Sequence, residues 1–305
     1  MSNNPTRKVL VMHLVGGIGN QLFVYYAGKV LANQVDRNLS LDFSDVNRGH
    51  NMDDISKLNI SCFIESSAIK RALKRLWLYK YVDAIKYNYR IPNRLKGSLL
   101  FPLMETEIGE LGKFKKRNRI HVAGYFQTPN YFDTHQHLFP YSNLLSDHSE
   151  LISKPSTINW NRTLGVHVRR GDYLGHRNTF GLLSKEWYCD ALKFALNMLE
   201  TKIDTIVFFT NDSEWVSKNL DPVIDTVRYK VIVEKDSETT SATGVLKEMQ
   251  RCEGLVISNS TFSLMGAFHS SATVFTPDTF FRKQESSLLK DERENWFKVK
   301  SRWED

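Results

Sequence analysis

The sequence has little cysteine and no long apolar run, and each shortage excludes a class of protein. Its three cysteines, Cys62, Cys189 and Cys252, are odd in number and form no CxxC pair. We therefore expect reduced thiols and a cytoplasmic protein rather than a disulfide-stabilised secreted one. No segment approaches the roughly 20 apolar residues that span a bilayer. The short apolar run at 8–14 is followed by Gly-Gly and a helical pattern, which predicts a buried strand rather than a secretion signal.

An excess of positive charge is also absent outside one segment, although the chain has a formal net charge of +7. Residues 70–96 contain nine lysines or arginines against one acid, Asp83. The remainder is close to neutral, which argues against a nucleic-acid partner. Leucines and aromatic residues alternate with the basic ones in this segment. Two interpretations stay open: peripheral contact with the anionic inner face of the cytoplasmic membrane, or a basic helix packed on the first domain.

The length of 305 residues suits two domains, and the hydrophobic pattern predicts that both are α/β. "KVLVMHL", "GGIGNQ", "LFVYYAGKVLANQ" and "NLSLDF" predict strand, glycine loop, helix and strand, which is the start of a parallel sheet. In the second half we expect strands at 163–169, 205–210, 229–234, 254–258 and 273–276. We expect helices there at 184–199, 213–220, 242–252 and 262–270.

We therefore predict two Rossmann-like domains that face each other across a cleft, because ligands bind at the carboxyl ends of parallel strands. The domains are expected at 1–155, on the acceptor side, and at 156–290, on the nucleotide side. A C-terminal helix is expected over 291–305, packing back on the body, because Trp296, Val299 and Trp303 would share one helical face.

Three loops after strands of the second half carry polar residues that suit a phosphorylated ligand. In "GVHVRRGDYL", strand alternation places His167 and Arg169 on one face, while Arg170 orders the loop or pairs with an acid. A guanidinium suits a diphosphate, and Asp172 can hold its rotamer. The other loops add the following polar and aromatic residues: Thr210, Asn211, Asp212, Asn259, Ser260, Thr261 and Phe262. Each loop alone also fits helix capping or a structural Arg–Asp network, and only the three together predict a nucleotide-diphosphate pocket.

The N-terminal glycine loop leaves a second interpretation open. Gly17, Gly19, Asn20 and Gln21 partly match a dinucleotide fingerprint, and Asp42 ends the next strand at a suitable distance. The third glycine of the fingerprint is missing, and an NAD(P)-dependent dehydrogenase would not explain the three later loops. A catalytically inactive nucleotide- or sugar-binding protein is a further alternative.

The four motifs "GGIGNQLF", "HVRRGDY", "FFTND" and "ISNSTFS" occur in an order that resembles the bacterial alpha-1,2-fucosyltransferases of glycosyltransferase family 11. The resemblance runs from residue 8 to about 270. It departs from the family at Leu264 and Met265, where aromatic residues are common.

This resemblance implies a GT-B fold and inverting transfer of L-fucose from GDP-β-L-fucose, without a metal or other cofactor. It assigns Arg169 to the diphosphate, His167 to the nucleotide, and Asp172 to support of the loop. The residues of the FFTND loop, with Arg170, would line the nucleotide pocket, and those of the ISNSTFS loop would bind phosphate. Gly17, Gly19 and Asn20 would approach the sugar from the first domain.

The expected acceptor is the 2-hydroxyl of a β-linked galactose in a surface glycan such as O-antigen, either free or lipid-linked. No HExxH, DxD or clustered Cys and His appears in a plausible site, so arginine and a helix N-terminus would neutralise the leaving diphosphate. The catalytic base stays open among Asp172, Glu186 and the first-domain loop.

Overall fold

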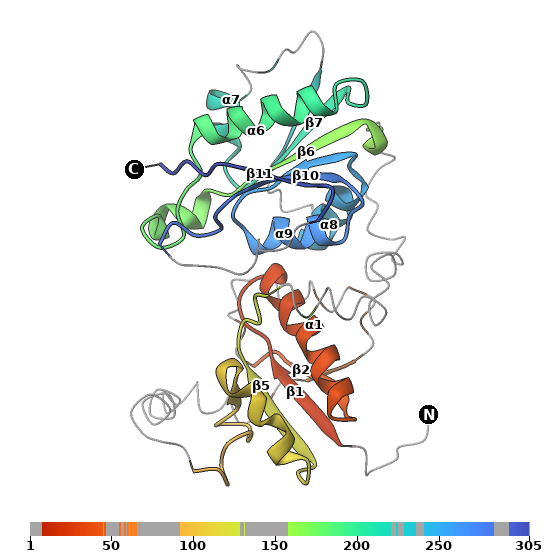
Figure 1. The fold of residues 1–305 in the computed structure, drawn as a ribbon, viewed down its shortest axis with the longest axis vertical. Coiled ribbons are helices and arrows are strands. Elements are labelled where there is room, and N and C mark those ends of the chain that lie inside the picture. Colours follow the sequence, from red (N-terminus) through yellow and green to blue (C-terminus); the bar gives the residue numbers. More distant parts are fainter. Residues whose placement is uncertain are drawn as a thin grey trace. The chain divides into compact units, whose positions relative to one another are not determined.

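The computed structural model forms two compact units, residues 1–140 and residues 141–305, called here the first and second unit. It describes residues 8–44, 46, 55, 58, 60, 62–65, 67, 92–128, 131, 158–220, 224, 229–235, 241–283 and 293–304 (Figure 1). The sequence placed the boundary between 155 and 156, and both this position and the observed division lie outside the described residues. Most of the basic segment, residues 70–91, also lies outside them.

The first unit is a parallel sheet with strand order β3-β2-β1-β5-β4. Its strands are β1 (Val9–His13), β2 (Asn38–Asp42), β3 (Phe63–Glu65), β4 (Leu103–Met104) and β5 (Arg119–Ala123). Helix α1 (Ile18–Gln34) connects β1 to β2, and a 3₁₀ helix (Glu105–Phe114) follows β4. The predicted strand–loop–helix–strand start is thus confirmed.

Helix α1 lies very close to one face of this sheet. A Cβ atom at Gly28 would be 2.7 Å from Met12 and 2.8 Å from Leu39, so only glycine allows this approach. Because side chains alternate along a strand, Val11 and His13 of β1 lie on the opposite face. The sheet face that α1 covers is therefore apolar, whereas buried polar side chains gather on the opposite face of the sheet.

The second unit is a larger parallel sheet with strand order β11-β10-β9-β6-β7-β8. Its strands are β6 (Thr163–Val168), β7 (Thr205–Thr210), β8 (Lys230–Lys235), β9 (Gly254–Val256), β10 (Thr273–Pro277) and β11 (Trp296–Val299). Its helices are α6 (Lys185–Met198), α7 (Ser213–Asn219), α8 (Ala242–Arg251) and α9 (Thr261–Phe268). The expected strands and helices of residues 163–276 are all present, with ends that differ by at most two residues.

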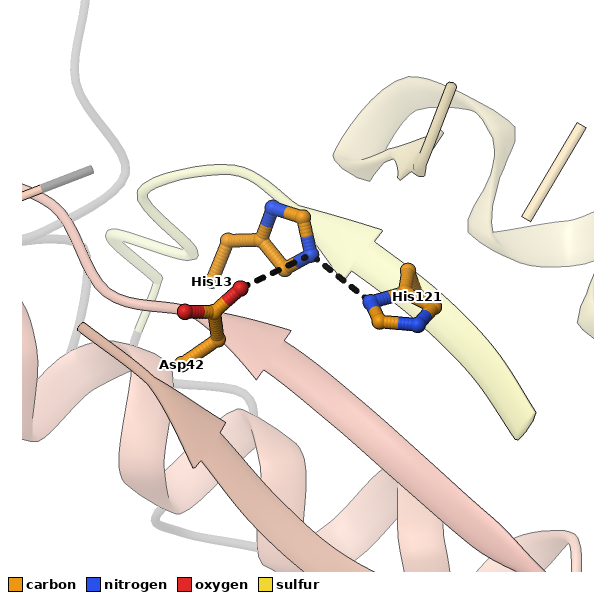
Figure 2. A group of neighbouring side chains, drawn as sticks. All are labelled: His13, Asp42 and His121. Carbon is orange, nitrogen blue, oxygen red and sulfur yellow. Dashed lines mark hydrogen bonds and ion pairs between the residues drawn. The ribbon is translucent and has the colours of Figure 1, made fainter. Parts of the chain in front are cut away.

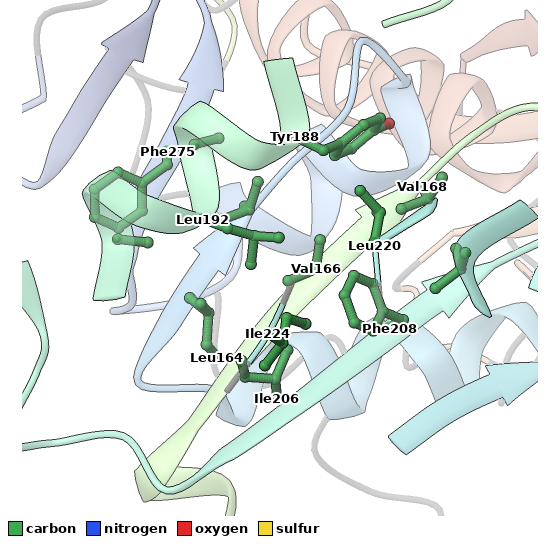
Figure 3. Close-up of a cluster of buried hydrophobic side chains, with 14 of the residues drawn as sticks. Leu164, Val166, Val168, Tyr188, Leu192, Ile206, Phe208, Leu220, Ile224 and Phe275 are labelled. Atoms are coloured by element: carbon green, nitrogen blue, oxygen red, sulfur yellow. The ribbon is translucent and has the colours of Figure 1, made fainter. Parts of the chain in front are cut away.

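Helices α6 and α7 cover one face of this sheet, and α8 and α9 cover the other (Figure 1). Under α6 and α7, Leu164, Val166 and Val168 of β6 pack with Phe208 of β7 and Leu192 of α6 (Figure 3). Each of these side chains is at most 3% exposed, so each contributes roughly 1.5–3 kcal/mol of hydrophobic stabilisation. This core fixes the ends of β6 and β7, from which the loops of the site begin.

The predicted C-terminal helix over 291–305 is wrong. Residues 296–299 form strand β11, which pairs with β10 in parallel register, and Trp303 makes an antiparallel bridge with Leu183. Aromatic and β-branched residues in "WFKV" favour a strand. The spacing of Trp296 and Val299 does not distinguish a helix from a strand, because the segment has only four residues. The tail does pack back on the unit, as expected, but it does so by extending the sheet.

The three cysteines are free, as the sequence predicted. Burial raises the pKa of the Cys62 thiol to about 12 and also raises the pKa of Cys252. These thiols are therefore poor nucleophiles at neutral pH. None of the helices in the described ranges is both long and apolar enough to cross a membrane.

Candidate active site

The site in the second unit lies where the direction of strand order reverses. Strand β6 lies at the centre, with β7 on one side and β9 on the other, and all three run parallel. Ligands of doubly wound sheets bind at this position, outside the carboxyl ends of the strands. The loops at 169–172, 211–212 and 257–260 begin there, so the sequence correctly predicted that these three loops come together.

Arg169 is the arginine of this site that reaches solvent, and Asp172 orients it. Its Nε lies 2.8 Å from Asp172 Oδ1, and its Nη2 donates a hydrogen bond of 2.9 Å to Asp172 Oδ2. The guanidinium carbon lies 5.8 Å from the ring centre of Tyr173. The Arg169 side chain is 28% exposed and the Asp172 side chain 51%. The predicted role of Asp172 as the support of an arginine is confirmed.

Arg170, in contrast, is buried and paired with acidic side chains. Both of its terminal nitrogens donate to the carboxylate of Glu304, and its Nε lies 3.4 Å from Asp212 Oδ2. Its guanidinium also lies over the Trp215 ring, 4.1 Å from the centre. Since the residue is only 6% exposed, the expectation that Arg170 pairs with an acid is confirmed, whereas its expected role as a nucleotide ligand is wrong because Glu304 and Asp212 occupy its guanidinium.

The polar residues after β7 organise the loops rather than extending into an open site. Asn211 Oδ1 accepts hydrogen bonds from the backbone N–H groups of Arg170 and Gly171. Asp212 caps α7 by accepting from the Trp215 N–H, and its own N–H donates to Thr210 Oγ1. The capping interpretation of Asp212 is therefore correct, and Asn211 links the loop after β7 to the loop after β6.

His167 is buried beside the site and is held as a neutral imidazole. Its Nδ1 lies 2.8 Å from Ser258 Oγ, and its ring centre lies 5.5 Å from that of Phe262. Burial, with a smaller contribution from the charge of Arg169, lowers the pKa of His167 to about 3. A neutral imidazole can donate or accept a hydrogen bond but adds no positive charge beside Arg169.

The start of α9 forms the third part of the site. Ser260 caps the helix by accepting from the Phe262 N–H, and Thr261 and Phe262 are half-buried in its first turn. Tyr173 connects this turn to the arginine loop, because its hydroxyl donates to the Asn259 carbonyl. Burial raises the pKa of Tyr173 to about 12, so it remains a neutral donor.

Asn259 has a different role from the one predicted. Its Nδ2 donates to the carbonyls of Phe180 and Gly181, and its Oδ1 has no hydrogen-bond partner among the described residues. A phosphate carries only acceptors, so this side chain cannot bind one with its remaining atom. The free Oδ1, on a residue that is 1% exposed, instead suits an N–H or O–H group of a ligand.

The glycine loop of the first unit is structured as the start of α1. Gly16 has a positive φ of 66°, and Gly17 occupies the N-cap position without a side-chain cap. Gly19 is buried in the first turn, and Asn20 Oδ1 accepts from Gln127 Nε2. Asp42, the residue that the dehydrogenase interpretation needs for a ribose, is 1% exposed and accepts hydrogen bonds from Ser44 instead.

The chain belongs to glycosyl transferase family 11, because the model of that family matches residues 65–299. It is therefore a glycosyltransferase. Two curated proteins of Escherichia coli are similar over almost their whole length. An alpha-1,2-colitosyltransferase is 24% identical over 95% of this chain and 99% of its own, and the O-antigen biosynthesis glycosyltransferase WbnK is 26% identical over 90% and 96%.

Solved structures share the fold at low sequence identity. Fucosyltransferase NodZ from Bradyrhizobium matches with a TM-score of 0.51 at 14% identity, covering 91% of this chain and 97% of NodZ. POFUT1 in complex with GDP-fucose matches with a TM-score of 0.50 at 11% identity, covering 89% of this chain and 96% of POFUT1. With two parallel α/β units, the predicted GT-B fold class is confirmed, and family membership does not favour the dehydrogenase.

Sequence reasoning missed three residues that shape the site. Glu304 lies at the far end of the chain, yet it holds Arg170. Tyr173 and Ser258 stand inside the quoted motifs, but only the folded loops reveal their partners Asn259 and His167. The sequence offered one signal for Glu304, namely that a buried arginine requires a carboxylate. This signal does not identify which carboxylate is the partner.

Proposed function

We propose that this glycosyltransferase transfers L-fucose, with inversion, from GDP-β-L-fucose to the 2-hydroxyl of a β-linked galactose in a surface glycan such as O-antigen. The observation that carries the proposal is the contrast between the two adjacent arginines. Arg170 is locked by Glu304, whereas Arg169 is oriented by Asp172 and reaches solvent at the switch point of the sheet. The names of the relatives, which include an O-antigen glycosyltransferase, support the surface glycan.

In this proposal Arg169 binds the diphosphate of the donor. Its contacts with Asp172 use Nε and one side of Nη2, so Nη1 remains to donate to a phosphate oxygen. The first turn of α9 supplies backbone N–H groups and the positive end of a helix dipole. Together they stabilise the charge that develops on GDP as the bond to fucose breaks, so the donor reaction needs no metal ion.

The neighbouring groups would recognise the nucleoside and exclude water. The acceptor atom Asn259 Oδ1 suits an N–H group of guanine or a ribose hydroxyl, and neutral His167 can form one further hydrogen bond. Asp172 is engaged with Arg169, which favours a positioning role over that of the base. Glu186 has a pKa lowered chiefly by its hydrogen bond with Ser184, which makes it a weaker base than an ordinary glutamate.

A colitosyl donor is the second candidate, because a relative of almost equal length is named an alpha-1,2-colitosyltransferase. Colitose is fucose without its 3-hydroxyl, so the same diphosphate site would serve both donors. Discrimination would then depend on whether a polar group pairs with that hydroxyl. A site built to bind the hydroxyl rejects the deoxy sugar by roughly 10⁴-fold, whereas an apolar site discriminates weakly.

The test is product formation, followed by mass spectrometry and by NMR of the new linkage. Purified protein is incubated with GDP-fucose or GDP-colitose and with β-galactosides, and 2-deoxygalactosides serve as the acceptor control. We expect one donor to be used, an α-linked product on the intact galactoside and no product on the deoxy acceptor. Absence of transfer from either donor, together with tight GDP binding, would support the inactive binding protein instead. Anionic vesicles and lipid-linked acceptors, added in separate arms, would test the proposed membrane contact.

A further inference from the structure

The first unit contains a buried polar cluster that the donor reaction does not use. His13, Asp42 and His121 come from the three neighbouring strands β1, β2 and β5. They are 2%, 1% and 8% exposed. Burying a carboxylate is costly unless another group compensates its charge, so a cluster of this kind on a sheet face needs a physical reason.

Strand register brings the three side chains to one point. His13 pairs with Asp42 across β1 and β2, and Val11, two residues before His13, pairs with His121 across β1 and β5. Because residues two apart share a face, all three side chains lie on the sheet face opposite α1. His13 Nε2 lies between the other two groups, 3.0 Å from His121 Nδ1 and 3.9 Å from Asp42 Oδ2 (Figure 2).

We propose that these residues form a site for a divalent first-row transition metal, for which Zn²⁺ is the best match. Two imidazoles and one carboxylate are a preferred donor set for this ion. Zn–ligand bonds of about 2.0–2.2 Å at a tetrahedral angle separate donor atoms by about 3.3–3.6 Å. The distance from His13 Nε2 to His121 Nδ1, 3.0 Å, is below this range, and its distance to Asp42 Oδ2, 3.9 Å, is above it. All three donor atoms lie within 4.8 Å of one another. Small side-chain rotations would therefore complete the site.

A supporting contact orients the carboxylate for this role. Asp42 Oδ1 accepts hydrogen bonds from both the backbone N–H and the hydroxyl of Ser44, which leaves Oδ2 on the side of the histidines. Outer contacts of this kind fix metal-binding carboxylates. Three protein ligands leave a fourth position of the tetrahedron for water or a ligand oxygen.

The position in the fold indicates what the ion would do. His13 is the last residue of β1, and the chain continues directly into the glycine loop at Gly16 and Gly17. The Leu14 N–H donates to the Asp42 carbonyl, so β2 already holds the start of this loop. A bound ion would brace this loop and the ends of three strands of the first unit.

Metal content of the tag-free, full-length protein tests the proposal. The protein is stripped with a chelator, loaded with Zn²⁺, gel-filtered and measured by mass spectrometry. We expect about one Zn²⁺ per chain in the wild type, and more than tenfold weaker binding in Asp42→Asn and His121→Gln. His176→Gln, which alters an exposed histidine of the second unit, should bind as the wild type does. Circular dichroism establishes that each variant is folded.

Cobalt supplies a readout that does not depend on the variants. Co²⁺ added to the stripped wild type should give the intense visible absorption of a tetrahedral site, and Zn²⁺ should abolish it. A wild type that retains no Zn²⁺ and gives no such spectrum would overturn the proposal, as would Asp42→Asn retaining wild-type affinity. The cluster would then be a hydrogen-bonded network. GDP binding by the second unit is measured separately, so failure here leaves the proposed function intact.

Discussion

Removal of the carboxylate that holds Arg170 should destabilise the protein measurably. Loss of one partner from a fully buried ion pair costs about 3–5 kcal/mol, and exposed pairs contribute less than about 1 kcal/mol. The Arg170 side chain is 8% exposed and the Glu304 side chain 29%, and Asp212 and Trp215 still contact the guanidinium after the change. We therefore expect Glu304→Gln to lower the free energy of unfolding by about 2 kcal/mol, between these limits.

Urea unfolding followed by circular dichroism measures this change. The midpoint of thermal unfolding should fall by about 4–8 °C, at roughly 2–4 °C per kcal/mol for a domain of this size. Glu294→Gln alters an exposed glutamate of the same C-terminal segment and should leave stability unchanged within about 0.5 kcal/mol. In a double-mutant cycle, Arg170→Met should cost less when Glu304 is already glutamine. An effect of Glu304→Gln no larger than that of the control, or an additive cycle, would refute this reasoning.

Two further predictions concern the loops and buried histidines. A Cβ atom at Gly171 would be 2.6 Å from Asn211 Nδ2, so Gly171→Ala should displace the arginine loop. Calorimetry should then show GDP binding that is weaker by more than about tenfold. Gly175→Ala is the control and should bind GDP normally, because the space around Gly175 is open. The pKa values of His167 and His269 are lowered by burial to about 3 and about 4, so the unfolded chain binds more protons below pH 6.5. The free energy of unfolding should therefore be independent of the titration of these two histidines above pH 6.5 and should decrease as the pH drops from 6.5 toward 4. His269→Asn should flatten that dependence in denaturant titrations, and an unchanged slope would count against a buried neutral imidazole.

Local sequence patterns were sufficient for most of the second unit. Strand β7 and the capping role of Asp212 follow from alternation and from short-range hydrogen bonds, which the sequence encodes within a few residues. The C-terminal strand was missed because "WFKV" is too short for its period to decide, and pairing with β10 determined its structure.

Contacts between distant residues set the limit of prediction at the site. Glu304 and Arg170 are 134 residues apart, and His13 and His121 are 108 apart. No spacing motif can encode such pairs, because their proximity depends on strand order and register in the folded sheets. The sequence therefore predicted which loops gather at the donor site and that Arg170 pairs with an acid, but it did not predict that this acid is Glu304.

The central claim is that Arg169 binds the diphosphate of a guanosine-diphosphate sugar, and calorimetric titration of GDP tests it most directly. Titrations into the wild type, Arg169→Ala and Arg162→Ala are compared, with chelator present. Arg162 pairs with Asp204 at the opposite end of β6, so its variant is the matched control. Loss of charge-assisted hydrogen bonds worth about 2–3 kcal/mol predicts roughly 30- to 150-fold weaker binding for Arg169→Ala and none of this loss for the control. Equal GDP affinity in Arg169→Ala and the wild type would contradict the account.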